Sequence, residues 1–129
     1  MSVESVLFTR LSTFPGLTAL VGQRIYPNQG PDKPTLPYVT YRRVSSERPS
    51  AMGVDVGIVR ARFQFDAWAD TFDGASAVRE QIRAALQRWR SATGTVVQDT
   101  YFLTDMDLYE EDTRLHHLVA DFEINYVEA

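Results

Sequence analysis

Residues 58–90 read IVRARFQFDAWADTFDGASAVREQIRAALQRWR and contain the two clearest periodic patterns of the chain. From Ile58 to Ala69 apolar and polar side chains alternate strictly, which is typical of a strand with one buried face. From Asp73 to Arg90 apolar residues recur at helical spacing, which predicts a long amphipathic helix. A strand followed by a long helix is therefore the centre of the predicted fold.

Shorter elements are predicted on both sides of this pair. A short helix should run from Ser2, which can cap it, to about Leu11. Pro15-Gly16 should break this helix, and residues 17–21 should form one more helical turn closed by Gly22. The remaining predicted strands cover residues 24–26, 38–44, 95–104 and 115–127, and the remaining stretches 27–37 and 45–57 are predicted to be loops.

These elements predict one domain of the α+β class over residues 1–129. Strands that are neighbours in sequence usually pair, so we expect an antiparallel or mixed β-sheet packed against one long helix, with a short N-terminal helix. The length of 129 residues fits a single core. Two predicted strands of about 12 residues are long for such a domain, so their ends should bend or project toward a neighbour.

The composition limits the possible functions. Apolar residues make up 44% of the chain and charged residues 23%, which is ordinary for a globular protein. The longest apolar run is well short of a membrane span, and we expect neither a membrane partner nor a secretory signal. The chain contains no cysteine, which excludes disulfides and thiol catalysis and is compatible with assembly in a reducing cytoplasm.

Charge is distributed unevenly along the chain. The net charge of −4 argues against a dedicated nucleic-acid binder, which usually carries a basic excess. Residues 1–90 have a balance of +4 and residues 91–129 a balance of −8. Of the 13 basic residues only Lys33 is lysine, and arginine is the cation favoured in protein interfaces. Arg42, Arg43 and Arg48 can contact phosphate, but interface pairing or solvation fits the acidic chain better.

No pattern predicts a catalytic or metal site. His116 and His117 are adjacent in a predicted strand, so their rings should face opposite sides and should not share a metal ion. The acidic cluster lacks the glycine and the ligand spacing of a calcium loop and is interpreted as a solvated turn or a subunit contact. We therefore expect no enzyme activity, no metal and no cofactor. The cluster consists of Asp105, Asp107, Glu110, Glu111 and Asp112.

Four segments together resemble the family of phage tail completion proteins, also called tail terminators. They are residues 17–27, residues 36–41, the strand from 60 to 68 with the helix from 75 to 86, and residues 108–113. The resemblance implies a structural virion protein of the tail or neck, assembled in the host cytoplasm. It implies a ring, typically a hexamer, that caps the tail tube protein and joins it to the head-tail connector protein. DNA would pass through the lumen without sequence-specific binding, and the family supplies no catalytic residues.

A head-to-tail ring needs two different complementary patches on each subunit. The candidate interface residues are the arginines of the strand 58–69 and of the helix 73–90, together with the acidic residues near position 110. The alternative interpretation is that both groups are solvated faces without a partner. Two other functions stay open, namely another phage neck or connector protein and a small-molecule-binding α+β module, which a deep polar pocket in a monomer or dimer would favour. The candidates are Arg60, Arg62, Arg79, Arg83, Arg90, Glu110, Glu111 and Asp112.

Overall fold

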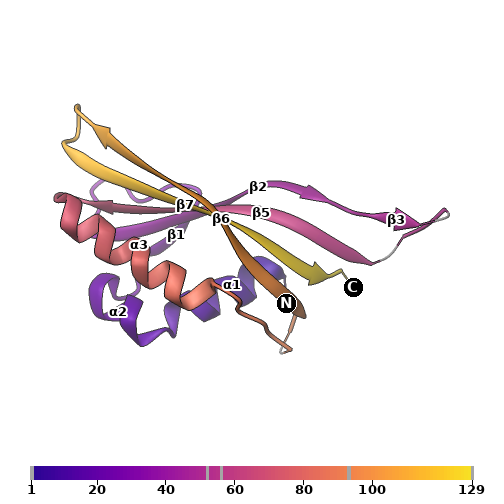
Figure 1. Cartoon of the computed structure of the whole chain (residues 1–129). Coiled ribbons are helices and arrows are strands. Elements are labelled where there is room, and N and C mark those ends of the chain that lie inside the picture. Colours follow the sequence, from indigo (N-terminus) through magenta and orange to yellow (C-terminus); the bar gives the residue numbers. More distant parts are fainter. Residues whose placement is uncertain (1, 52, 56, 93, 129) are drawn as a thin grey trace.

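One face of a long twisted sheet is covered by helices, and the other face is open (Figure 1). The computed structural model describes residues 2–51, 53–55, 57–92 and 94–128. The α+β class predicted from the sequence is confirmed. The elements are α1 (Val3–Ser12), α2 (Pro15–Val21), β1 (Ile25–Pro27), β2 (Tyr38–Glu47), β3 (Ser50–Ala51), β4 (Val54–Asp55), β5 (Ile58–Ala69), α3 (Phe72–Leu86), β6 (Val97–Glu110) and β7 (Leu115–Val127).

The main sheet is mixed, as the sequence predicts. Its strand order is β1-β2-β5-β7-β6. Only β1 and β2 pair in parallel, and the other neighbours are antiparallel. The strands β5 and β7 therefore lie at the centre, while β6 forms one complete edge. The short strand β1 forms the other edge only opposite Val39, Thr40 and Tyr41.

The core lies between the sheet and α3, where the two periodic patterns of the sequence meet. Strand β5 has the predicted bounds, and its apolar residues face the helices. Val78 and Ile82 of α3 are fully buried against this face. Phe63, Phe65 and Phe122 are the largest fully buried side chains, and edge-to-face packing of Phe65 on Phe122, with ring centroids 5.6 Å apart, joins the two central strands.

The first two helices form largely as predicted. Ser2 caps α1 and accepts a hydrogen bond from the backbone N–H of Ser5 at 3.2 Å. Pro15 ends the first helix as expected, but it also begins α2, because proline fits the first helical turn. Gly22 follows α2 with φ 58° and ψ −125°, a conformation that only glycine adopts easily.

The long helix is shorter than predicted. It ends at Leu86 rather than Arg90, because the chain turns at Arg88, whose φ is +61°. The N–H of Arg88 donates to the carbonyl of Thr100, and Ser91 pairs with Val97. The apolar pattern of the sequence continues past the end of the helix because Trp89, which follows the turn, still packs partly buried against the core. Residues 88–91 therefore cover the first part of the β6 edge.

The predicted loop at 45–57 is largely wrong. Strand β2 continues to Glu47, which pairs with Arg60 of β5, and β3 pairs with β4 beyond it. Two positions of the predicted loop, 52 and 56, lie outside the described residues. Sequence periodicity missed these strands because polar and small residues occupy them. We call the described part of residues 45–60 the arm. The loop predicted at 27–37 forms except at Pro27, which is the last residue of β1.

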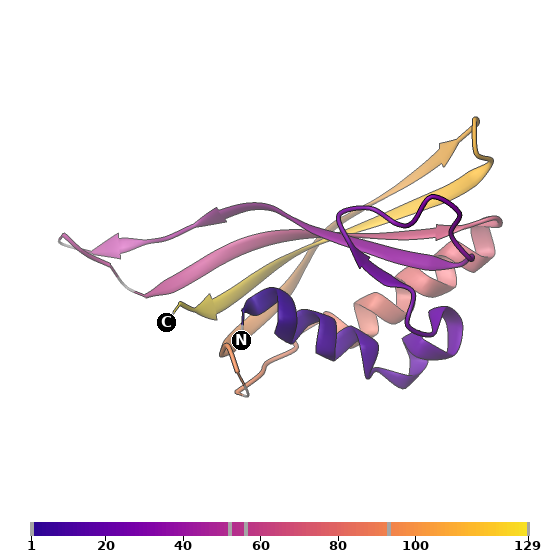
Figure 2. The same ribbon diagram turned by 180° about the vertical axis from the view of Figure 1, so that it is seen from behind.

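The other end of the sheet also extends past the helices. Strand β6 reaches Glu110 instead of residue 104, so Asp105 and Asp107 lie in a strand rather than in a turn. We call residues 103–114 the acidic half-hairpin, which contains the exposed end of β6 and the turn before β7. Figures 1 and 2 show that it and the arm project in opposite directions along the sheet.

Candidate assembly surfaces

The five predicted interface arginines do not form one surface. Arg60 and Arg62 lie on the face of β5 away from the helices, and Arg79 and Arg83 lie on α3. Arg90 is exposed in the connection after α3. The predicted helix-and-strand surface is therefore divided by the sheet.

Three of these arginines pair with carboxylates of their own chain. Arg62 binds Asp121, whose side chain is only 9% exposed. Arg79 Nη1 lies 2.5 Å from Asp107 Oδ1, and the side chain of Arg79 is only 13% exposed. Arg83 lies 3.3 Å from Glu80 on the same helix. Within the described residues Arg60 forms no ion pair, although Glu47 of β2 lies opposite it in the strand register.

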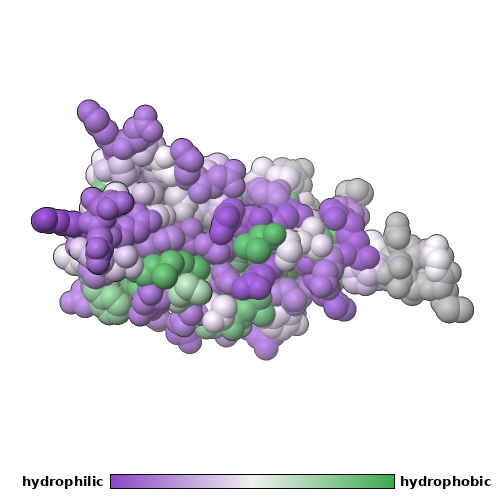
Figure 3. Space-filling model, turned by 90° about the horizontal axis from the view of Figure 1, so that it is seen from above, coloured by the Kyte–Doolittle hydropathy of each residue, from purple (hydrophilic) through white to green (hydrophobic). Residues whose placement is uncertain are grey.

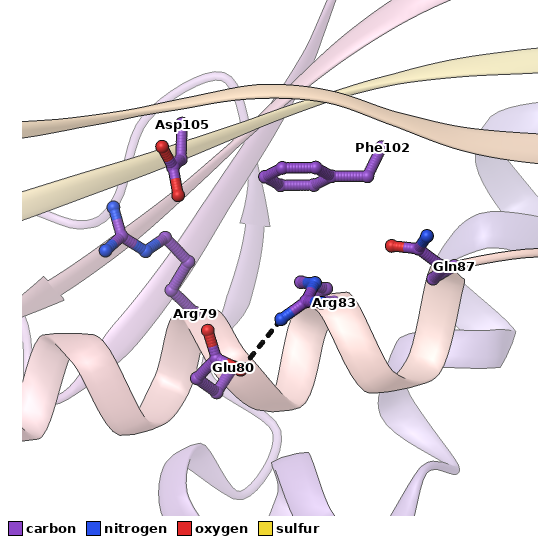
Figure 4. Close-up of a pocket in the computed structure, with 6 residues that line it drawn as sticks. All are labelled: Arg79, Glu80, Arg83, Gln87, Phe102 and Asp105. Carbon is purple, nitrogen blue, oxygen red and sulfur yellow. Dashed lines mark hydrogen bonds and ion pairs between the residues drawn. The ribbon is translucent and has the colours of Figure 1, made fainter.

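A hollow between α3 and β6 contains the two helix arginines (Figure 4). Its volume is about 170 Å³, and positive and negative side chains alternate around it. Arg83 stacks over the ring of Phe102, with its guanidinium carbon 5.7 Å from the ring centroid. The lining has neither a nucleophile nor a histidine, so its chemistry is ion pairing. The residues are Arg79, Glu80, Arg83, Gln87, Phe102 and Asp105.

The two histidines lie on opposite sides of β7, as strand geometry predicts. His117 stacks on Trp68 with ring centroids 3.9 Å apart, and its Nε2 lies 3.3 Å from Asp66 Oδ2. His116 instead contacts Phe72 and Tyr109 on the helix side. No group of three or more metal-binding side chains occurs among residues 2–51, 53–55, 57–92 and 94–128.

A row of aromatic rings crosses the open face near the acidic half-hairpin. Tyr38 stacks on Trp68, with centroids 5.8 Å apart and planes 7° apart, and Trp68 stacks on His117. Burial raises the pKa of Tyr38, and the negative charge of Glu110 raises that pKa further. The acidic end of β6 therefore lies close to a rigid aromatic row.

The predicted acidic cluster is exposed and mostly unpaired. Asp107 is held by Arg79, but Asp105, Glu110, Glu111 and Asp112 form no ion pair in the described part of the chain. Glu110 accepts a hydrogen bond from the hydroxyl of Thr113 at 3.2 Å. Four uncompensated negative charges thus gather at one end of the molecule.

The sequence did not reveal the exposed apolar residues of the same strand. Leu103 is 47% exposed, Met106 55%, Leu108 43% and Tyr109 51%. The shift in register between Phe102 and Thr104 places Leu103 outside the regular alternation. Figure 3 looks onto the open face and shows hydrophobic patches within a mostly hydrophilic surface. The available signal in the sequence was the mixture of apolar and acidic residues at positions 103–109.

Comparison with known proteins identifies the family. The model of the family described as tail completion protein gp17 matches residues 5–126. The chain belongs to the tail completion protein family. The resemblance noted in the sequence is thereby confirmed. The protein is a structural component of the virion tail. Membership of such a family points to a non-enzymatic role.

The fold recurs in a solved virion. The chain is similar to a protein in a structure described as the virion of a native gene transfer agent particle. The two chains share 18% identity with a TM-score of 0.79, and the match covers 94% of this chain and 91% of the other. No curated protein matches the chain. No helix of the described residues is both long and apolar enough to cross a membrane.

Proposed function

We propose that the tail completion protein is a ring-forming tail terminator. The ring, typically a hexamer in the family that the sequence resembles, caps the finished tail tube and joins it to the head connector. The observation that carries this proposal is the pair of opposed, differently charged ends on one elongated sheet. A subunit with two different complementary ends is suited to head-to-tail association, which closes into rings.

Two further observations support assembly around DNA. A protein of the same fold is part of a gene transfer agent virion, and therefore of a larger assembly. The net charge of −4 means that a ring of such subunits would repel the DNA backbone on average, so DNA could slide through the lumen without being held.

The charged contacts of the ring are proposed at the two ends. The acidic turn at Glu110, Glu111 and Asp112 of one subunit would approach the face of the next subunit that contains Arg60. Arg79 is a weaker candidate than it was from the sequence, because Asp107 already neutralises it. Arg62 and Arg83 are weaker candidates for the same reason, since Asp121 and Glu80 pair with them, and Arg90 remains an exposed candidate. Exposed ion pairs contribute only ~0–1 kcal/mol each, so apolar contacts must supply most of the affinity.

Electron microscopy of the purified protein, alone and mixed with tail tubes, tests the proposal. We expect rings with a central hole, and we expect them at one end of each tube. A protein that stays monomeric under both conditions, or that binds along the tube wall, would show that it is not a terminator. Rings that bind isolated connectors but never tubes would place the protein elsewhere in the neck.

A further inference from the structure

Both edges of the main sheet are covered over part of their length and open over the rest. Strand β1 covers β2 only as far as Tyr41, and residues 88–91 cover β6 only as far as Thr100. Among the described residues no strand pairs with the outer edge of β2 from Arg42 to Glu47. The same holds for the outer edge of β6 from Phe102 to Glu110. The second opening is about 30 Å long, at ~3.3 Å per residue.

The open edge of β6 carries acidic side chains and a register shift but no covering segment among the described residues. Exposed edges are commonly protected by charged side chains, bulges, proline or cover from a loop. Residues 102–110 contain neither lysine nor proline, and residues 103–110 are all exposed. Leu108 and Tyr109 stand among them with about half of their surface in solvent. The carbonyl of Met106 accepts a hydrogen bond from Arg79 at 3.4 Å, and no described strand pairs with the rest of this edge. Open backbone groups beside exposed apolar side chains are the features of a surface that adds a strand from a partner.

Charge selects which strand this edge accepts. A second β6 edge would bring Asp105 and Glu110 of two copies together, and like charges across an interface are unfavourable. The open edge of β2 carries two arginines, Arg42 and Arg43, and one carboxylate, Glu47. Arg43 pairs with Glu4, whereas Arg42 forms no ion pair within the described residues, and Val44 beside it is 47% exposed.

We infer that the open β6 edge of one subunit pairs with the arm-side edge of β2, residues 42–47, of a second copy. The inference rests on the proposed ring and names the strands that join its subunits. Because the two edges differ, the contact is head-to-tail and leaves one open edge of each kind until the ring closes. The acidic half-hairpin of one subunit then lies beside the β2 edge of its neighbour, where the neighbour's arm begins.

Cysteine crosslinking tests the contact directly, since the chain has no cysteine of its own. Val44→Cys and Met106→Cys replace exposed apolar residues on the two edges. A bis-maleimide about 10 Å long tolerates a difference in register of roughly two residues. A mixture of the two variants should give a crosslinked dimer, and the double variant should give a ladder that ends at the ring size. Each single variant alone should stay uncrosslinked.

The matched control is Val96→Cys, an equally exposed valine outside both edges, which should not crosslink to Val44→Cys. If rings form but the mixture gives no dimer, the strand pairing is wrong while the terminator function stands. Self-crosslinking of Met106→Cys alone would instead indicate a symmetric pairing of two β6 edges and would overturn the inference. Absence of any oligomer would overturn both the inference and the proposed ring.

Charge reversal gives a second, independent readout. Arg42→Glu with Arg60→Glu should raise the dissociation constant of the ring roughly tenfold. Adding Glu110→Lys and Glu111→Lys to the same chain should restore much of the loss, because opposite charges again face each other. None of these four residues has an ion-pair partner within its own described chain, so the changes break no ion pair inside the subunit. Rings that are indifferent to both changes would contradict the charge pairing.

Discussion

At the scale of single residues, the buried charges of the open face are held by specific partners. Asp121 is only 6% exposed, and Arg62 binds one of its carboxylate oxygens, while Oδ1 has no hydrogen-bond partner among the described residues. A buried carboxylate that loses its cation keeps the cost of being removed from water. Arg62 therefore stabilises the central sheet, whereas Arg60, two residues away on the same face, is free for assembly.

This difference predicts unequal effects of two similar substitutions. Arg62→Ala should lower the free energy of unfolding by about 1–3 kcal/mol, because Asp121 becomes an unpaired buried charge. Arg60→Ala should change it by less than about 0.5 kcal/mol. Urea denaturation of the monomer measures both. Adding Asp121→Asn to Arg62→Ala should recover part of the loss; equal effects of the two alanine variants would contradict the assignment.

At the scale of elements, sequence patterns located those parts of the fold that side-chain periodicity determines. The bounds of β5 and β7, the cap at Ser2 and the helix stop at Gly22 all follow from local chemistry. The end of α3 was missed because Trp89 keeps an apolar residue in phase after the backbone has already turned at Arg88. The arm was missed because its strands are held by pairing with each other, which polar residues allow as well as apolar ones.

The candidate site was predictable only in part for the same reason. The sequence showed that basic and acidic residues are segregated, and the structure places the acidic ones together. The sequence did not show which arginines pair within the chain. Arg79 and Asp107, for example, are distant in sequence and meet only when β6 lies against α3. The open strand edges depend entirely on which strands are neighbours.

Strand pairing joins the arm to residues 125–127, and an exposed ion pair between Arg48 and Glu128 adds to this attachment in a way that should depend on pH. Arg48 forms hydrogen bonds to both carboxylate oxygens of Glu128, at 2.9 and 3.1 Å from its Nε. The hydrogen bond from Arg48 lowers the pKa of Glu128. A lowered pKa means that the pair stabilises the arm above the ordinary pKa of glutamate and is lost as pH falls through the lowered value.

We predict that hydrogen-exchange protection of the arm, corrected for the intrinsic effect of pH, decreases as the solution is acidified through this range. Arg48→Gln should reduce protection at neutral pH and remove most of the pH dependence. Arg42→Gln, which changes an arginine of β2 that forms no ion pair within the described residues, is the control. An arm equally protected in Arg48→Gln and the unchanged protein would mean that strand pairing alone holds it.

At the scale of the whole molecule, helices cover the centre of the sheet, and its two ends extend beyond them (Figure 2). Arg42 and Arg60, which form no ion pair within the described residues, lie toward one end, and four carboxylates without an ion pair lie at the other. An interface between such ends is attractive at long range, and dissolved salt screens it.

We therefore expect ring formation to weaken as salt increases from about 0.05 to 0.5 M, a range over which the Debye length falls by roughly threefold. Sedimentation at several protein concentrations measures the dissociation constant. Glu110→Gln with Glu111→Gln should assemble more weakly at low salt and should respond less to added salt. A dissociation constant that does not change with salt would indicate that the ends meet through apolar contacts alone.

The difference between the two ends also gives any closed ring of this protein a polarity. A ring joined head-to-tail has a rotation axis but no two-fold axis across it, so its upper and lower rims cannot be equivalent. One rim can therefore be specific for a tube while the other is specific for a connector, without any second protein to distinguish them. Such an adaptor would also dock in one orientation only, and a tail capped by it could be completed at just one of its ends.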